Sequence, residues 1–175
     1  MELTTDVLLR GATWAQTIDG LSAIFKTRTN YSIFTLCITI GIMYDQRIER
    51  FEDKPDEEPR NVPRNVIQNN DNGRMDFMFQ AAVLSTRTLE LDEEERLDLA
   101  FGERQDFSRL GTDSKIAFLT SFANFGVTKL AELIGDTPIE SMENIKKFLV
   151  SSIEGYNFDL DGISDDVWLE DFTVY

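Results

Sequence analysis

The sequence contains no histidine, and this absence removes several kinds of catalytic site. Without an imidazole there is no Ser-His-Asp triad, no histidine-ligated metal and no histidine general base. The single cysteine, Cys37, can form neither an internal disulfide nor a zinc site. No Walker A loop or glycine-rich dinucleotide motif occurs in the sequence. We therefore expect a protein that is not an enzyme and that binds no cofactor.

Basic residues are scarce: 17 Lys and Arg stand against 32 Asp and Glu, a formal net charge of −15. Residues 1–87 carry 12 acids and 10 bases, whereas residues 88–175 carry 20 acids and 7 bases. A field of this sign repels nucleic acid and anionic membranes and attracts basic surfaces. We expect a protein partner with a basic surface and no direct binding of nucleic acid, although solubility alone would also account for the charge.

Long hydrophobic runs are missing as well. The most apolar stretch, Tyr31 to Tyr44, has 14 residues, whereas a membrane span needs about 20. The first residues lack the basic region of a signal peptide. We expect a cytoplasmic protein without membrane association, in which Cys37 is a reduced, buried thiol.

The apolar periodicity predicts a mainly α protein, a compact bundle of five or six helices. A single helical domain is expected over residues 1–155, followed by an acidic-aromatic C-terminal segment over residues 156–175. Ser32, Asp113 and Thr137 are the predicted N-caps of three helices. The predicted helices are Leu8–Ile24, Ser32–Phe51, Arg74–Thr86, Leu91–Phe101, Lys115–Ile134 and Thr137–Glu154.

Two segments are less clear. Residues 31–44 are long enough for a buried helix, but their β-branched residues and their alternation of larger and smaller side chains are also typical of a strand. Residues 52–73 contain three prolines and a short duplication, Arg60-Asn-Val-Pro and Arg64-Asn-Val. We predict a long polar loop over residues 52–73, either mobile or functional.

Residues 157–165 share part of the pattern of an EF-hand calcium loop. Oxygen ligands occur at alternating positions, with Gly162 at the bend. The bidentate glutamate of position 12 is missing, because Trp168 stands there. A solvated acidic turn is therefore expected in place of a metal site. The weak calcium candidates are Asn157, Asp159, Asp161 and Asp165.

The last eleven residues alternate acids with bulky apolar groups. Such a peptide can place aromatic side chains in a groove while its acids meet a basic rim. Alternatively, the same side chains close over the protein's own core. The candidate partner-binding residues are Asp165, Asp166, Trp168, Glu170, Asp171 and Phe172.

A candidate basic patch comprises Lys26, Arg28, Arg47 and Arg50. The stretch Lys26-Thr-Arg-Thr-Asn-Tyr-Ser-Ile-Phe-Thr-Leu-Cys-Ile-Thr-Ile-Gly-Ile42 resembles a helix opening in DndE, the small subunit of bacterial DNA sulfur-modification systems. It is also loosely similar to a ribbon-helix-helix segment. The DndE resemblance implies a role in bacterial genome defence or DNA modification, but this chain lacks the strongly basic character of that family.

Three functions follow from these features. The first is a non-catalytic acidic subunit or adaptor of a larger, bacterial protein complex. The second is an inhibitor that mimics nucleic acid, and the third is a small ribbon-helix-helix-like DNA-binding protein. The acidic run Asp92 to Glu95 is expected to be a solvated face, because nothing selects a catalytic pair of carboxylates from it.

Overall fold

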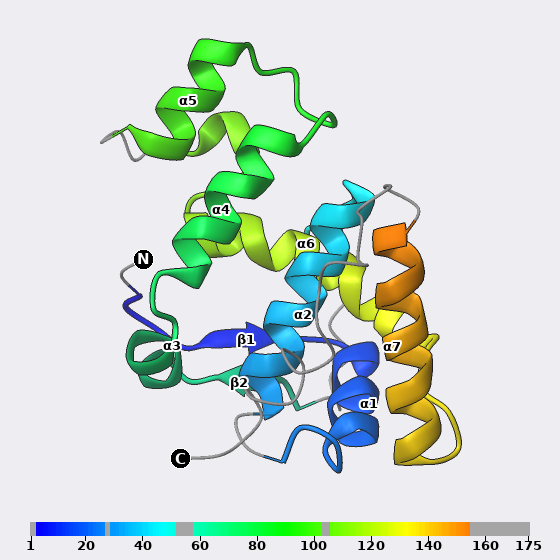
Figure 1. Ribbon diagram of the computed structural model, residues 1–175. Coiled ribbons are helices and arrows are strands. Elements are labelled where there is room, and N and C mark those ends of the chain that lie inside the picture. The colour runs from blue at the N-terminus through cyan, green and yellow to red at the C-terminus, as the bar shows by residue number, and fades with distance from the viewer. Residues whose placement is uncertain (1–2, 27–28, 52–57, 103–105, 155–175) are drawn as a thin grey trace.

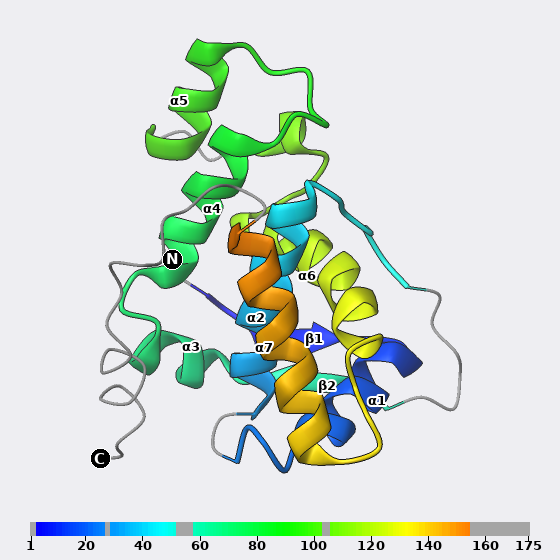
Figure 2. The same ribbon diagram turned by 45° about the vertical axis from the view of Figure 1, so that its right-hand side comes forward.

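The computed structural model describes residues 3–26, 29–51, 58–102 and 106–154, and it confirms a mainly helical protein (Figures 1 and 2). This part of the chain contains seven α-helices, one more than the upper predicted number. The elements are β1 Val7–Leu9, α1 Ala12–Leu21, α2 Thr29–Tyr44, β2 Arg60–Val62, α3 Arg64–Asn70, α4 Arg74–Ser85, α5 Glu93–Phe101, the 3-10 helix η1 Ser108–Leu110, α6 Lys115–Ala131 and α7 Pro138–Glu154.

Helices α2 and α6 pack against each other at the centre of the molecule. Each helix contributes one glycine to their contact, so that the two backbones approach closely. A Cβ on Gly41 would lie 2.6 Å from the carbonyl carbon of Phe122, and a Cβ on Gly126 would lie 2.6 Å from that of Cys37. Real Cβ atoms essentially never approach below 3.0 Å, so no larger residue fits at either position without a shift of the backbone.

The core confirms that residues 31–44 are a helix and that Cys37 is buried. Ile33, Phe34 and Cys37 have no exposed surface, and burial raises the pKa of the Cys37 thiol well above its ordinary value. Helix α6 carries an aromatic stripe of Phe118, Phe122 and Phe125, which is buried at Phe118 and Phe122. Its third member, Phe125, is half-buried, and its ring lies 5.6 Å from that of Tyr44.

The prediction of one long loop over residues 52–73 is wrong for its second half. Strand β2 pairs antiparallel with β1 in the register Val7 to Val62 and Leu9 to Arg60, and α3 follows directly. Val62 and Ile67 are buried against the core. The burial of these two apolar side chains and the pairing of β2 with β1, 53 residues earlier in the chain, stabilise regular structure in the segment despite its polar composition.

Several predicted helix boundaries also differ from the structure. The helix predicted over Leu8–Ile24 is shorter, because Leu8 and Leu9 pair with β2 in strand β1 and α1 covers only Ala12–Leu21. Helix α2 begins at Thr29, before the predicted cap Ser32, and ends at Tyr44 because Asp45 adopts the left-handed backbone conformation, with φ 50°. Ser114, next to the predicted Asp113, caps α6 and accepts a hydrogen bond from the backbone N–H of Ala117.

Helix α5 and the end of α4 project together from one end of the molecule, far from the β1–β2 pair, as both views show (Figures 1 and 2). The remaining helices surround α2 and α6, with α7 and α1 on one side. Within the described residues, no helix combines the length and the apolar character that crossing a membrane requires.

Candidate partner-binding surface

The N-terminus of α5 is held by a capping box. The side chain of Asp92 accepts a hydrogen bond from the backbone N–H of Glu95 at 2.8 Å, and the Glu95 carboxylate accepts one from the N–H of Asp92 at 3.0 Å. The first turn also contains Glu93 and Glu94. Carboxylates are stabilised at this end of a helix by the unpaired N–H groups and the helix dipole. The predicted acidic helix start is therefore confirmed, and its acids are in a favourable position.

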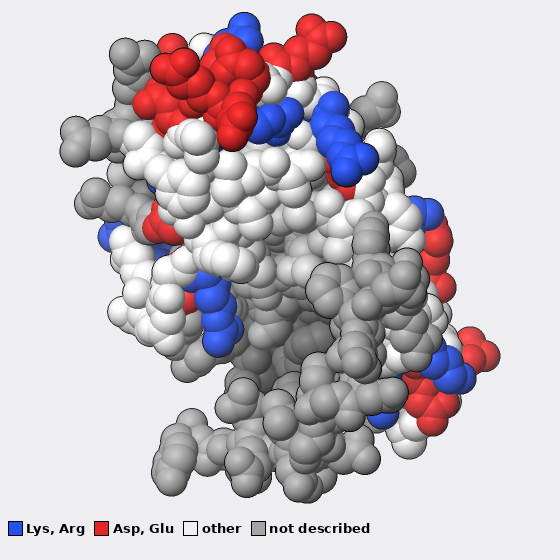
Figure 3. Space-filling view, turned by 45° about the horizontal axis from the view of Figure 1, so that its top comes forward, with Lys and Arg blue, Asp and Glu red and all other residues white. Residues whose placement is uncertain are grey.

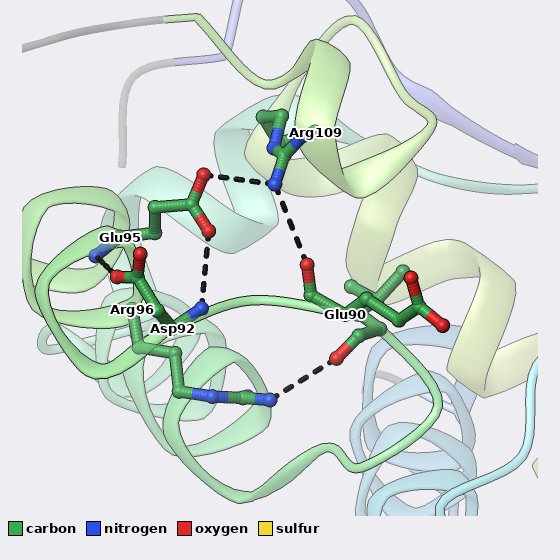
Figure 4. Close-up of polar contacts among 6 residues, drawn as sticks. Glu90, Asp92, Glu95, Arg96 and Arg109 are labelled. Atoms are coloured by element: carbon green, nitrogen blue, oxygen red, sulfur yellow. Dashed lines mark hydrogen bonds and ion pairs between the residues drawn. The ribbon is translucent and has the colours of Figure 1, made fainter.

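Two arginines fasten α5 to its neighbours (Figure 4). The Arg96 guanidinium donates to the backbone carbonyls of Val83 and Thr86, at 2.8 and 2.7 Å, where α4 ends. It also donates to the carbonyl of the connecting loop at Leu89, at 3.2 Å. Arg109 forms an ion pair of 2.8 Å with Glu95. Arg96 and Arg109 are thus already engaged within the protein.

The outer face of α5 combines unpaired acids with exposed apolar side chains. The carboxylates of Glu93, Glu94 and Asp98 have no hydrogen bond or ion pair with the residues that the structure describes. Leu97 and Phe101 lie four residues apart, on one face of the helix, and are 47% and 61% exposed. These side chains line a groove of about 850 Å³, whose lining residues are Asp92, Glu93, Glu94, Glu95, Leu97, Asp98, Phe101 and Gly102.

The space-filling view shows how the charges are distributed around this groove. Acidic side chains gather over α5 at the top of the molecule, and a broad area without charged side chains adjoins them (Figure 3). On α4, Phe77 and Leu84 are also exposed, at 70% and 41%. They lie seven residues apart, two helical turns, and so share a face of α4. The projecting helices therefore present both negative charge and uncovered apolar surface.

The residues predicted as sites are distributed differently. The calcium candidates and the tail residues proposed for partner binding, Asn157 to Phe172, lie outside the described residues. So does Arg28 of the candidate basic patch. Lys26 precedes α2, whereas Arg47 and Arg50 follow it, so the length of a 16-residue helix, about 24 Å, separates them. The structure does not bring these bases together into one patch.

The sequence pattern indicated the acids of α5 but not the exposed apolar side chains of Leu97 and Phe101 among them. Leu97, Leu99, Ala100 and Phe101 occupy more than one face of a short helix, which is more than a single core contact can bury. This excess of apolar residues indicates that some of them must remain exposed. Which of them is covered depends on α4, and in the structure Leu99 and Ala100 are buried while Leu97 and Phe101 are not.

Comparison of the chain with protein-family models, with curated proteins and with solved structures finds no match in any of the three. Within the described residues, no three Cys, Asp or Glu side chains converge to hold a metal ion.

Proposed function

We propose that this protein is a non-catalytic acidic subunit or adaptor, which binds a basic partner through the groove on α5. The observation that carries the proposal is the presence of Leu97 and Phe101, both exposed, between the unpaired carboxylates of Glu93, Glu94 and Asp98. Binding energy at protein interfaces is concentrated in a few apolar anchors, which a polar rim surrounds. Carboxylates at such a rim increase the association rate with a cationic partner and select its charge.

The groove is also suited to binding because its helix is held in place before a partner arrives. The capping box at Asp92 fixes the start of α5, and Arg96 ties it to the end of α4. A surface that is already ordered loses less conformational entropy on association. The chemistry of the matching ligand is a Lys- or Arg-bearing amphipathic segment whose apolar side chains cover Leu97 and Phe101.

Site-specific crosslinking tests this proposal. Leu97 is replaced by the photo-crosslinking amino acid p-benzoylphenylalanine, and a matched protein carries the same group at Ile139, which is 67% exposed on α7. We expect a discrete crosslinked partner from position 97 alone, joined through a segment rich in Lys and Arg. Equal crosslinking from both positions, or a partner segment without basic residues, would contradict the proposal.

Affinity measurements with the identified partner then separate the two contributions. Phe101→Ser should accelerate dissociation at least tenfold, about 1.4 kcal/mol, whereas Ile139→Ser should leave it unchanged. Replacing Glu94 and Asp98 by their amides should slow association and weaken its dependence on salt, because exposed charges act over about 8 Å at physiological ionic strength. Deleting residues 165–175 in the same assay tests whether the acidic-aromatic tail adds a second contact.

A second candidate function, a nucleic-acid-mimicking inhibitor, is favoured by the adjacent unpaired carboxylates of Glu93 and Glu94. In this case the crosslinked partner is a nucleic-acid-binding protein, and duplex DNA competes with the acidic groove for it. An adaptor remains bound when DNA is added. A role in bacterial genome defence or DNA modification is proposed on the DndE resemblance alone. Of the stretch that carries this resemblance, residues 31–42 lie in α2 and are largely buried in the core.

A further inference from the structure

A second hollow lies away from α5, where the segment after α2 meets η1 and the start of α6. It has a volume of about 660 Å³, within the range of small-molecule sites. Residues from three separate parts of the chain line it, and it is partly open to solvent. The lining includes Asp45, Arg47, Glu49, Ser108, Thr112 and Asp113.

Arg47 is the only base that lines this pocket among the described residues, and its guanidinium is poorly satisfied. It lies 5.3 Å from the ring centre of Phe118 and 5.8 Å from that of Phe122. Its one hydrogen bond to a described residue goes to the carbonyl of Leu110, at 3.4 Å, and it forms no ion pair within the described chain. Burial lowers the pKa of Arg47, and the charges of Asp45 and Glu49 offset this effect only in part.

The Arg47 guanidinium is half-buried and makes a single long hydrogen bond within the described residues, and neither Asp45 nor Glu49 forms an ion pair with it, although their charges favour its cationic form. Charged groups that lose contact with water are ordinarily paired and hydrogen-bonded. The planar fork of arginine matches a carboxylate, which it can bind through two parallel hydrogen bonds. Within the described residues, only the bond to the Leu110 carbonyl uses an N–H of this fork, so further N–H groups remain for a ligand.

The pocket wall is fixed in place before a ligand arrives. Asp45, in its left-handed conformation, accepts hydrogen bonds from the hydroxyl of Thr86 at 2.6 Å and from the backbone N–H of Arg87 at 2.7 Å. The N–H of Ile48 donates to the carbonyl of Ser121 on α6, at 2.9 Å.

The acids of the pocket restrict the charge of its ligand. Each carboxylate oxygen of Asp45 already accepts a hydrogen bond from the protein. Asp45 therefore contributes negative charge to the pocket but is not the main hydrogen-bond acceptor for a ligand. Glu49 has no side-chain partner in the described chain, and Asp113 accepts one long bond, of 3.3 Å, from Ser114. A pocket lined by three carboxylates and one guanidinium repels a phosphate or another dianion. A ligand with one carboxylate and one ammonium group satisfies both signs of charge.

We propose that this pocket binds a small zwitterion of the amino-acid class, its carboxylate on the Arg47 guanidinium and its ammonium group facing Glu49 and Asp113. The site is separate from the α5 groove and does not depend on the proposed adaptor function. No residue of α5 lines it.

The test uses the full-length protein and the free L-amino acids as probes, each added singly at millimolar concentration. Saturation-transfer NMR detects binding, and calorimetry measures the affinity of those that bind. Arg47→Met keeps an unbranched apolar side chain but removes the guanidinium fork, and Lys146→Met is the matched loss of one exposed cation on α7. Glu49→Gln, at an exposed position, provides a second variant that does not touch the aromatic core.

We expect at least one amino acid to bind saturably to the wild type and to Lys146→Met with equal affinity. Arg47→Met should weaken this binding about tenfold or more, in keeping with a charge-assisted bidentate contact. Glu49→Gln should weaken it as well, and acetate should bind less tightly than the amino acid. The absence of binding by every amino acid, unchanged affinity in both Arg47→Met and Glu49→Gln, or equally tight binding of acetate would overturn the proposal.

Discussion

Replacing Gly126 by alanine is expected to destabilise this protein strongly, although the change adds one methyl group and favours helix formation. Gly126 lies in α6, where that helix touches the backbone of α2. The new Cβ would lie 2.6 Å from the carbonyl carbon of Cys37 and 2.8 Å from its Cα, whereas ordinary contact begins at 3.4 Å. The obstructing atoms are backbone, so no rotation of a side chain can relieve the contact, and one central helix must move.

The magnitude follows from two opposing terms. Alanine in place of glycine gains about 1 kcal/mol of intrinsic helix stability. Overfilling a packed core costs about 1–3 kcal/mol where side chains can adjust, and a rigid backbone contact lies at or above the upper end of that range. We expect a net loss of about 2 kcal/mol or more, which lowers the melting temperature by about 4–8 °C for a chain of this size.

Gly20→Ala is the matched control, because it makes the same chemical change in a helix. Position 20 is an exposed residue of α1, and its Cβ would meet the flexible methyl groups of Ile134 at 3.2 and 3.3 Å. This variant should be neutral or up to about 1 kcal/mol more stable. Urea unfolding followed by far-UV circular dichroism measures both variants. If Gly126→Ala were as stable as Gly20→Ala, the close packing of α2 on α6 would be refuted.

Three further predictions concern the core and the cap of α5. Phe122→Ala, at a site that is 1% exposed, should cost about 3–5 kcal/mol in the same unfolding assay, and an unchanged midpoint would contradict its burial. Burial raises the pKa of Cys37, so the folded state retains the thiol proton. The associated stability is present below the unfolded pKa, about 8.5, and is lost as pH rises above it. The wild type should therefore lose more free energy of unfolding in alkaline solution than Cys37→Ala, and parallel losses would refute this linkage. Asp92→Ala should cost about 0.5–2 kcal/mol by removing the bond to the N–H of Glu95, and hydrogen exchange should locate the loss in α5.

Local sequence signals were sufficient for most of the helices. The acids at Asp92 to Glu95 predicted the start of α5, since a capping box involves only residues within one turn. The same holds for Thr137, whose hydroxyl accepts from the N–H of Glu140 at the start of α7. The length and uniformly apolar character of residues 31–44 favoured the helix that α2 forms.

The candidate sites depended on contacts that local patterns do not contain. Leu97 and Phe101 are exposed because α4 covers a different face of α5, and no property of either residue alone reveals this. The pocket at Arg47 needs residues about 60 positions apart, such as Glu49 and Ser108, to meet across α6. The bases predicted to form one patch are separated for the same reason. Lys26 lies before helix α2, whereas Arg47 and Arg50 lie after it, so the helix holds them at its two ends.

The duplicated tripeptide gives the clearest division between what sequence and tertiary structure decide. Arg60-Asn61-Val62 is a β-strand, whereas Arg64-Asn65-Val66, with the same three residues, begins helix α3. Composition and periodicity were enough to predict a mainly helical, strongly acidic chain without the residues for histidine or disulfide chemistry. The conformations of the two copies depend on the contacts that each one makes in the fold. The first copy pairs with Val7 to Leu9 as a strand. The second copy follows Pro63, whose extended backbone precedes the helix. In that helix Ile67 is buried in the core, whereas Gln68 is exposed.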